Sequence, residues 1–231
     1  MKPAPKSLKA VIFDLDGTLV DTADEFVVIV QALRAEHGRE AMDPQRIRAS
    51  VSNGARALVS LALDIAEDSA GFETQRLRLL ELYSGVLGSV ARLYPGIAEL
   101  LGELERRNVS WGIATNKPRA YTAPLLERLN LQPQPGSVVC PDDVTERKPH
   151  PESLLRNCRE LGCNPDQAIY IGDHLRDIEA GRRAGMYTIA AAYGYIEPGD
   201  DPYSWGADAH ADSSADLGKM ILGGWGGPTH I

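Results

Sequence analysis

An acidic pair directly after a short apolar run is the feature that most constrains this chain. Val11-Ile12-Phe13 runs straight into Asp14-Leu15-Asp16-Gly17-Thr18. The apolar run predicts a buried strand, and the residues after it predict a polar loop at the end of that strand. Gly17 permits a sharp turn, which can re-aim the carboxylate of Asp16 relative to that of Asp14. In open α/β folds ligands bind at such strand ends, although an ordinary Asp-Gly turn is the alternative for this motif alone.

The composition is that of a globular chain long enough for one full domain and a sizeable insertion. It has 231 residues, of which 43% are hydrophobic and 24% charged. A formal net charge of −8 argues against a nucleic-acid or membrane partner, since both need a basic footprint. Three cysteines without CxxC spacing favour a reducing compartment. The first residues lead only into a strand-length apolar run, too short for a signal peptide. We therefore expect a cytoplasmic protein.

Residues 22–92 lengthen the first crossover far beyond what two parallel strands require. A dozen or more residues are enough for such a connection, yet this segment is helical in pattern almost throughout. Apolar residues recur at helical spacing in three groups, at 26–33, 58–65 and 77–87. We expect residues 22–92 to form a helical cap over the strand end, inserted into a core of residues 1–21 and 93–231.

Arg56 is the cap residue that we single out for contact with a substrate. It follows Asn53-Gly54-Ala55 in a polar stretch that opens the second of these helices. A guanidinium can hold a carboxylate bidentately, which a lysine cannot do. Arg56 is therefore a candidate substrate-binding residue, and a solvated surface arginine is the alternative.

Strand and helix patterns alternate through the rest of the chain. Strands are expected at 109–118, 137–140, 168–173, 186–192 and 207–211, with helices at 97–104, 119–130 and 176–184 and around Leu154 and Leu155. This alternation predicts an α/β fold with a doubly wound parallel sheet and right-handed crossovers. The glycine-rich end, residues 223–231, is expected to form a flexible tail.

Polar residues also stand at the ends of the later strands. They are Thr115 and Asn116, then Lys148, and finally Asp173 with Asp177. Taken singly, each has a simpler explanation, since threonine and asparagine cap helices and lysine is usually solvated. The carboxyl ends of parallel strands meet at one edge of a sheet, so we expect all of these side chains to converge on one crevice.

In this order, the four groups resemble the four motifs of the haloacid dehalogenase superfamily. The matching residues are Asp14-Leu15-Asp16-Gly17-Thr18, Thr115, Lys148, and Gly172-Asp173-His174-Leu175-Arg176-Asp177. The resemblance spans essentially the whole chain and implies a Rossmann-like core with a helical cap inserted after the first motif. His174 is one departure, because many members carry a small residue such as serine there. Every catalytic position of the family is present.

The resemblance implies a Mg²⁺-dependent phosphomonoesterase that acts on a small-molecule phosphate ester. Asp14 is the implied nucleophile, and its attack on phosphorus gives an aspartyl-phosphate. Asp14, Asp173 and the main-chain carbonyl of Asp16 are the implied ligands of Mg²⁺, which prefers hard oxygen ligands. Asp177 is implied to orient these ligands without binding the metal itself.

The same resemblance assigns the other core residues. Lys148 is implied to steady Asp14 and the phosphate, and Thr115 to donate to the transferring oxygens. Gly17 and Asn116 are the implied substrate-binding residues of the core. Asp16 is the implied general acid and base, which protonates the leaving alcohol and then deprotonates the attacking water.

Other functions are weighed against this one. A haloalkanoate dehalogenase of the same superfamily needs neither a metal nor a second acid, so Asp16 and Asp173 argue against it. A phosphonate hydrolase would carry a Schiff-base lysine in the cap, yet residues 22–93 contain no lysine. A sugar-phosphate mutase would share every core motif and stays open. A non-catalytic phosphate-binding protein would be expected to lack a core residue, and none is missing.

Further stretches bear on the substrate. The general pattern resembles the phosphoglycolate phosphatases. Residues 53–58, 115–118, 193–198 and 205–208 resemble the N-acetylmuramic acid 6-phosphate phosphatases of bacterial cell-wall recycling. On this second resemblance, Arg56 is expected to bind the lactyl carboxylate of the sugar, with phosphoglycolate as the alternative substrate. Nothing in the sequence specifies an oligomeric state.

Overall fold

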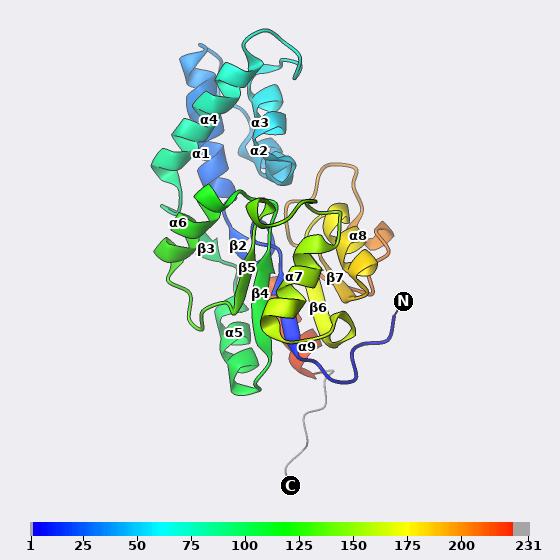
Figure 1. Ribbon diagram of the computed structural model, residues 1–231. Coiled ribbons are helices and arrows are strands. Elements are labelled where there is room, and N and C mark those ends of the chain that lie inside the picture. The colour runs from blue at the N-terminus through cyan, green and yellow to red at the C-terminus, as the bar shows by residue number, and fades with distance from the viewer. Residues whose placement is uncertain (1, 224–231) are drawn as a thin grey trace.

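A parallel sheet forms the centre of the molecule (Figure 1). In the computed structural model, which describes residues 2–223, the strands lie in the order β5 (Ser137–Val139), β4 (Ser110–Ala114), β1 (Ala10–Phe13), β6 (Ala168–Gly172), β7 (Tyr187–Ala191) and β8 (Ala209–Ala211). The chain runs outward from β1 on one side and then on the other, so the predicted doubly wound fold is confirmed. β1 and β6 flank the point where the direction reverses, which is where such folds bind ligands.

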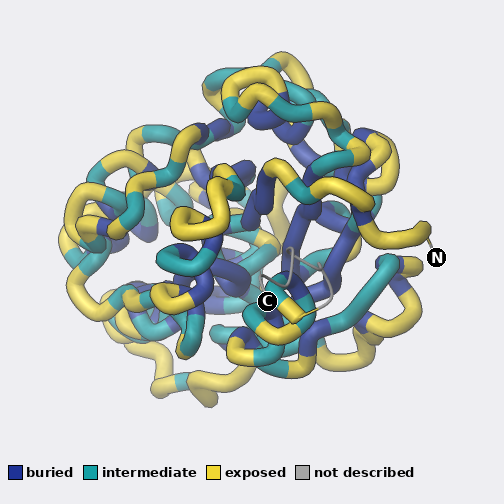
Figure 2. Tube along the Cα trace, turned by 90° about the horizontal axis from the view of Figure 1, so that it is seen from below, coloured by how far each residue is buried: buried dark blue, intermediate teal, exposed yellow. Residues whose placement is uncertain are grey.

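Both faces of this sheet are buried. Along β1, Val11 and Phe13 belong to one apolar cluster and Ala10 and Ile12 to another, because successive side chains of a strand point to opposite faces. All four are fully buried, which explains why the sequence shows an unbroken apolar run there instead of an alternating one. Figure 2 shows buried segments in the interior of the molecule and exposed segments around them.

Helices cover the two faces of the sheet. α7 (Glu152–Leu161) and α8 (Leu175–Ala184) pack on one face, and α5 (Ile97–Arg106) packs with α9 (Ser214–Gly223) on the other. α6 (Arg119–Leu129) connects β4 to β5. The strands and helices predicted for the core are confirmed, with ends that differ by up to four residues, the largest difference being at the strand predicted for 109–118, which ends at Ala114. α9 was not predicted.

The cap lies between two short strands, β2 (Val20–Asp21) and β3 (Arg92–Leu93), which pair antiparallel. Its helices are α1 (Ala23–Glu36), α2 (Pro44–Ser50), α3 (Gly54–Leu63) and α4 (Phe72–Val86), which pack on one another at one end of the molecule. α1, α3 and α4 correspond to the three apolar groups of the sequence. α2 was not predicted, because it is short and buries only Ile47, too little for a periodic pattern. The boundaries of the cap at 22 and 92 stay a prediction.

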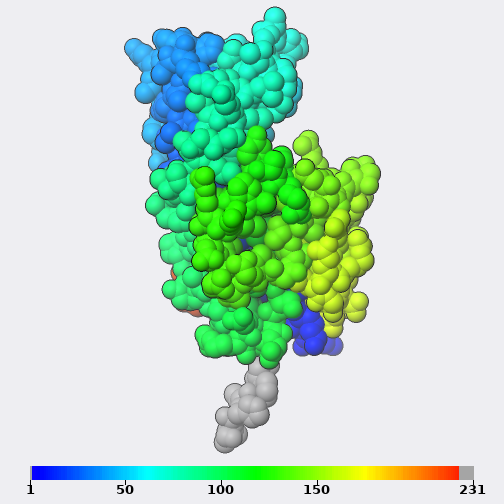
Figure 3. Space-filling model, turned by 60° about the vertical axis from the view of Figure 1, so that its left-hand side comes forward, coloured from blue at the N-terminus to red at the C-terminus, as the bar shows by residue number. Residues whose placement is uncertain are grey.

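Figure 3 shows the cap as a lobe above the core, with a hollow in the surface where the two meet. Short 3₁₀ helices lie at Val51–Asn53, Pro141–Asp143, Pro165–Gln167 and Pro202–Ser204. No helix within residues 2–223 is long and apolar enough to cross a membrane. The three cysteines are free thiols, with Cys140 and Cys158 buried and Cys163 partly exposed. The predicted flexible tail lies outside the described residues from residue 224 onward.

Candidate active site

Lys148 is a buried lysine that binds two of the carboxylates of the site. Its Nζ lies 2.8 Å from Oδ1 of Asp14 and 2.7 Å from Oδ1 of Asp177, and its side chain is 1% exposed. It also donates to the Tyr170 hydroxyl at 2.8 Å and to the Ala114 carbonyl at 2.9 Å. Burial by itself lowers the pKa of a lysine, but the two carboxylates outweigh burial and hold the pKa of Lys148 above its usual value. Lys148 is therefore a fixed positive charge beside Asp14.

Three carboxylates meet at the ends of β1 and β6. Oxygens of Asp14, Asp173 and Asp177 lie within 4.8 Å of one another. Burial, opposed by Lys148 and reinforced by Asp177, raises the pKa of Asp14 to about 6. Burial and the neighbouring Asp14 and Asp177 raise the pKa of Asp173 to about 8. Carboxyl groups this close resist ionising together unless a cation compensates their charge.

This cluster fits a divalent cation. Hard cations take carboxylate oxygens as ligands, and Lys148 brings only one positive charge to three acids. Asp177 is already held by protein partners, since its Oδ1 also accepts from the Tyr170 hydroxyl at 3.1 Å and its Oδ2 accepts from the His174 N–H at 3.1 Å. Both oxygens of Asp173 also accept hydrogen bonds, so it is the family resemblance that assigns Asp14 and Asp173 as metal ligands and Asp177 as a residue that orients them. The assignment stays a prediction.

Two glycines let the surrounding loops approach Asp173. A Cβ at Gly17 would lie 2.1 Å from Oδ2 of Asp173, and its φ of +82° is one that favours glycine. A Cβ at Gly194 would lie 2.2 Å from the Cβ of Asp173. The loop after β1 and the loop after β7 therefore close around this carboxylate, and Oδ2 also accepts the backbone N–H of Tyr195 at 2.9 Å.

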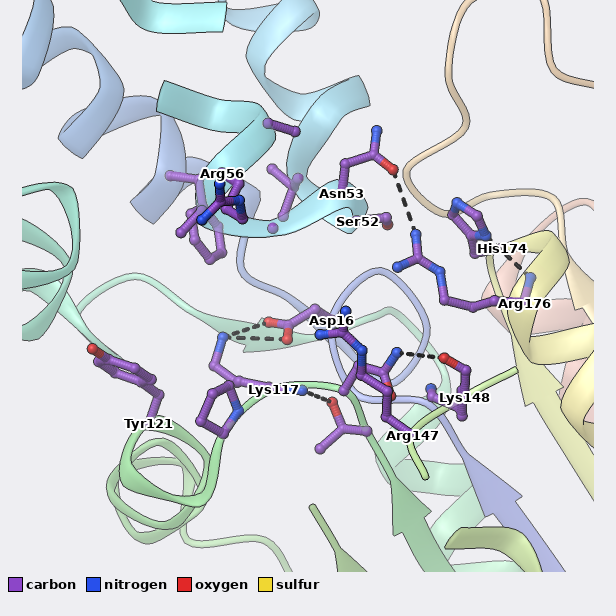
Figure 4. A pocket seen from close by; sticks show the side chains of 18 of the residues that line it. Asp16, Ser52, Asn53, Arg56, Lys117, Tyr121, Arg147, Lys148, His174 and Arg176 are labelled. Atoms are coloured by element: carbon purple, nitrogen blue, oxygen red, sulfur yellow. Dashed lines mark hydrogen bonds and ion pairs between the residues drawn. The ribbon is translucent and has the colours of Figure 1, made fainter. Parts of the chain in front are cut away.

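Asp16 has different partners from Asp14, as the predicted turn at Gly17 allows. The Thr22 hydroxyl donates to Oδ1 of Asp16 at 2.6 Å. Nζ of Lys117 lies 3.0 Å from Oδ1 and 3.2 Å from Oδ2 of the same carboxylate (Figure 4). The second acid of the motif is thus separated from the three-carboxylate cluster and held between the core and the first residue of the cap.

Thr115 and Asn116 lie at the end of β4, as predicted. The Thr115 hydroxyl accepts the backbone N–H of Lys117 at 3.0 Å, and its own proton can still be donated to a phosphate oxygen. Nδ2 of Asn116 donates to the Lys148 carbonyl at 3.1 Å. Asn116 therefore ties the loop that carries Lys148 to the end of the neighbouring strand.

A cavity of about 930 Å³ lies between the core and the cap. Among the predicted site residues, its lining includes Asp14, Asp16, Thr115, Asn116, Lys148, Asp177 and Arg56, whereas Asp173 and Gly17 are not part of it. Arg56 is the one contributed by the cap (Figure 4). Its Nε lies 2.5 Å from Oε2 of Glu67, its guanidinium lies over the Phe72 ring, and the side chain is 50% exposed. A solvated pair of this kind contributes little stability, so a substrate carboxylate can compete for it.

Sequence reasoning missed three residues of the site. Lys117 was noted only as part of the stretch 115–118, with no role of its own. Tyr170 lies within an apolar run and was expected only to pack in a buried strand. The Tyr195 hydroxyl accepts the backbone N–H groups of Thr22 and Ala23, at 2.7 and 2.9 Å, and so fixes the start of the cap. The stretch 193–198 was the signal that could have identified Tyr195, whereas the roles of Lys117 and Tyr170 depend on partners distant in the sequence.

His174 has a structural role in place of the family's small residue. Its Nδ1 accepts the backbone N–H of Arg176 at 3.1 Å and so caps α8, while its ring stacks on Trp205 with centroids 6.3 Å apart. Burial lowers the pKa of His174, and a neutral ring is what the acceptor role requires. The presence of His174 at a position where many family members carry a small residue therefore displaces none of the predicted catalytic side chains.

The fold and this constellation define a class of hydrolase. The family of haloacid dehalogenase-like hydrolases matches residues 11–191, and the chain belongs to it. The protein is a phosphoric monoester hydrolase. The N-acetylmuramic acid 6-phosphate phosphatase of Pseudomonas aeruginosa is 47% identical over 210 residues, which cover 91% of this chain and 93% of the relative. The enzyme of the same name from Pseudomonas putida is 44% identical, covering 93% and 96%.

Other similar proteins carry a different name. The phosphoglycolate phosphatase of Xanthomonas campestris is 38% identical over 209 residues, covering 90% of this chain and 94% of the relative. A crystal structure from Haemophilus somnus, described as a predicted phosphoglycolate phosphatase, matches with a TM-score of 0.80 and 26% identity, covering 93% and 98%. The class is thus shared, and the substrate is the property on which these relatives differ.

Mg²⁺ is expected to stabilise the protein more at pH 8 than at pH 5. The fold raises the pKa of Asp14 and of Asp173 from 3.8 to about 6 and about 8. At pH values between the unfolded and the folded pKa of each carboxyl, the folded state binds more protons than the unfolded state. The metal-free protein therefore loses stability as the pH rises from 3.8 to about 8. A bound cation offsets the growing repulsion. Thermal unfolding in Mg²⁺ and in EDTA, measured from pH 5 to 8, tests the difference in Tm.

Asp173→Asn is the matched control for this measurement. It removes one of the two carboxyl groups whose pKa is raised, so in EDTA the variant is expected to lose less stability than the wild type as the pH rises. Its Tm is also expected to respond less to Mg²⁺. A gain in Tm from Mg²⁺ that is the same at pH 5 and pH 8 in the wild type contradicts the metal assignment.

Proposed function

We propose that the protein hydrolyses N-acetylmuramic acid 6-phosphate in the cytoplasm, as a step of peptidoglycan recycling. Two relatives of that name match over more than nine-tenths of both chains, at 47% and 44% identity. The observation that carries the proposal is the cavity of about 930 Å³ between core and cap. Phosphoglycolate is a two-carbon acid that would leave most of this space to water. A hexose with N-acetyl and lactyl substituents occupies much more of it, and cavities of this size commonly take ligands of about that size.

Asp14 is the proposed nucleophile, because it stands at the end of β1 beside the buried ammonium of Lys148. In the first step a bond forms from its carboxylate oxygen to phosphorus while the bond from phosphorus to the sugar oxygen breaks. In the second step a water oxygen attacks the same phosphorus and the bond to Asp14 breaks, which releases inorganic phosphate. Lys148 and the Thr115 hydroxyl offset the charge on the phosphate oxygens.

Asp16 moves the protons in both steps. It gives its proton to the sugar oxygen as that oxygen leaves, and it takes a proton from the water that attacks the aspartyl-phosphate. Asp14, Asp173 and the main-chain carbonyl of Asp16 would hold Mg²⁺, with Asp177 orienting them. The metal would supply positive charge to the phosphate oxygens.

A panel of phosphate esters tests the proposal. kcat/KM is measured for N-acetylmuramic acid 6-phosphate, N-acetylglucosamine 6-phosphate and phosphoglycolate by the release of inorganic phosphate. We expect the muramic acid ester to give the highest value. A higher value for phosphoglycolate would replace the proposed substrate by its alternative. Consumption of a sugar phosphate without stoichiometric phosphate release would indicate a mutase.

Arg56→Lys is expected to lower kcat/KM for the muramic acid ester about tenfold relative to the glucosamine ester. The reason is the loss of one charge-assisted hydrogen bond to the lactyl carboxylate, worth roughly 1.5 kcal/mol. The two esters differ in that carboxylate, so the ratio of their kcat/KM values isolates it. Equal losses on both esters would show that Arg56 does not bind the carboxylate.

Two further arginines provide matched comparisons for Arg56. Arg147 and Arg176 line the same cavity, and neither forms an ion pair within residues 2–223. Figure 4 shows Arg176 reaching toward Asn53 of the cap, with 3.5 Å between Nη2 and the Asn53 Oδ1. Lysine variants of both are measured on the same two esters. If kcat/KM falls selectively for the muramic acid ester in one of these two variants and not in Arg56→Lys, the residue that binds the lactyl carboxylate belongs to the core.

A further inference from the structure

We infer that Lys117 is a positioning residue for Asp16, which it holds in place and links to the cap. The inference rests on the role proposed above for Asp16 as general acid and base. Lys117 lies three residues beyond the end of β4, and Asp16 lies in the loop after β1. Its ammonium contacts both oxygens of the Asp16 carboxylate, at 3.0 and 3.2 Å. The pair therefore fixes the direction of the carboxylate as well as balancing its charge.

The burial of Lys117 indicates that this pair is specific. The chain has six lysines; four of them are exposed, and only Lys117 and Lys148 are buried. The Lys117 side chain is 6% exposed and that of Asp16 is 17% exposed. A lysine gives up its hydration at such a site, so it needs a partner that compensates. Within residues 2–223, Asp16 is the carboxylate with which Lys117 forms an ion pair.

The other side of the ammonium faces two aromatic rings of the cap. Nζ lies 5.2 Å from the ring centroid of Phe26 in α1 and 4.7 Å from that of Tyr83 in α4. The two rings stack on each other, with centroids 4.6 Å apart and planes 20° apart. A cation over aromatic faces is attracted to them, most strongly where water is excluded. Lys117 thus contacts the acid of the core on one side and the cap on the other.

This arrangement makes the position of Asp16 depend on contact between core and cap. While the rings of Phe26 and Tyr83 cover the ammonium, the pair with Asp16 is shielded from water and strong. If the rings withdraw, the ammonium is hydrated and its hold on the carboxylate weakens. Proton transfer to the leaving oxygen requires a well-placed acid. Lys117 therefore couples the placement of the acid to the closed arrangement of the cap.

The test compares leaving groups. A sugar 6-phosphate releases an alkoxide, which needs a proton, whereas p-nitrophenyl phosphate releases a stable phenolate, which does not. We expect Lys117→Met to lower kcat/KM at least about tenfold for the best sugar ester, and less than about threefold for p-nitrophenyl phosphate, because general acid catalysis contributes a factor of about 100 or more. Lys117→Arg keeps the charge and is expected to recover part of the loss.

Asp16→Asn separates a failure of this inference from a failure of the proposed mechanism. If Asp16→Asn lowers kcat/KM by the same factor for the sugar ester and for p-nitrophenyl phosphate, the role of Asp16 as general acid is wrong. If Asp16→Asn is selective for the sugar ester but Lys117→Met is unselective or has no effect, the inference about Lys117 is wrong. Phe26→Leu removes one ring and is expected to show a smaller loss with the same selectivity. An unselective loss in this variant would overturn the link to the cap.

Lys9→Met is the matched control for the loss of a lysine. Lys9 is exposed and precedes β1 at the end of the strand opposite to Asp14, so its variant is expected to retain both activities. Thermal unfolding and circular dichroism of all variants identify any that fold incompletely. Because the readout is a ratio of two substrates on the same preparation, partial unfolding lowers both values and leaves the ratio unchanged.

Discussion

Asp14→Asn is expected to lower kcat at least about a hundredfold, the scale of losing a group that acts directly in the chemistry. The substitution removes the proposed nucleophile at nearly constant volume, since an amide oxygen does not attack phosphorus at a useful rate. Steady-state kinetics with the best sugar ester measure the loss. Retention of more than about one hundredth of the wild-type activity would remove Asp14 from the role of nucleophile.

The fold of Asp14→Asn is expected to survive, and its stability gives an independent readout. Burial raises the pKa of Asp14 to about 6, and Asp177 adds to this effect. Replacing the carboxylate by an amide therefore relieves repulsion within the cluster in the absence of metal. In EDTA near pH 8, the variant is expected to unfold at a Tm no lower than that of the wild type. A lower Tm would mean that the ion pair with Lys148 outweighs the repulsion.

Removing the metal is the second change with a large expected effect. EDTA is expected to abolish phosphate release, and added Mg²⁺ to restore it, because the buried carboxylates at the site leave excess negative charge where an anionic phosphate must bind. Ca²⁺ is expected to bind without restoring turnover, since it takes more ligands at longer distances than Mg²⁺. Activity titrations after exhaustive chelation measure all three outcomes.

Two controls make the metal experiment decisive. Asp173→Asn is expected to require a much higher Mg²⁺ concentration for half-maximal activity than the wild type. Asp16→Asn is expected to retain its affinity for Mg²⁺, because the proposed ligand there is a main-chain carbonyl. Full activity of the wild type after chelation would favour the metal-free chemistry of the dehalogenases. Loss of Mg²⁺ affinity in Asp16→Asn would contradict the division of roles between the two acids of the motif.

The sequence by itself determined the class of fold and the composition of the core site. In a parallel sheet the carboxyl ends of all strands lie at the same edge, whatever the order of the strands. Polar residues after successive apolar runs therefore had to meet, and Asp14 and Asp177 both lie within hydrogen-bonding distance of Lys148. The cap was also predictable from the sequence, because three of its helices, α1, α3 and α4, carry apolar residues at helical spacing.

The elements that were missed lack such local signals. α9 contains two glycines, which weaken a helix, and it depends on the burial of Leu217 and Ile221 against the core. The strand order, with β1 and β6 side by side, follows from long-range packing that no local window contains. The assignment of Arg56 depends on the same kind of information, because its pairing with Glu67 is a tertiary contact.

Tertiary structure alone decided the partners of the buried polar groups. A lysine at position 117 and a tyrosine at position 170 have no sequence signal for function, because an isolated lysine is usually solvated and a tyrosine within an apolar run reads as part of the core. The fold places Lys117 on the carboxylate of Asp16 and the Tyr170 hydroxyl on Lys148, across 101 and 22 residues of chain. Buried charges and hydroxyls need partners, and only the packed chain determines which partners lie within reach.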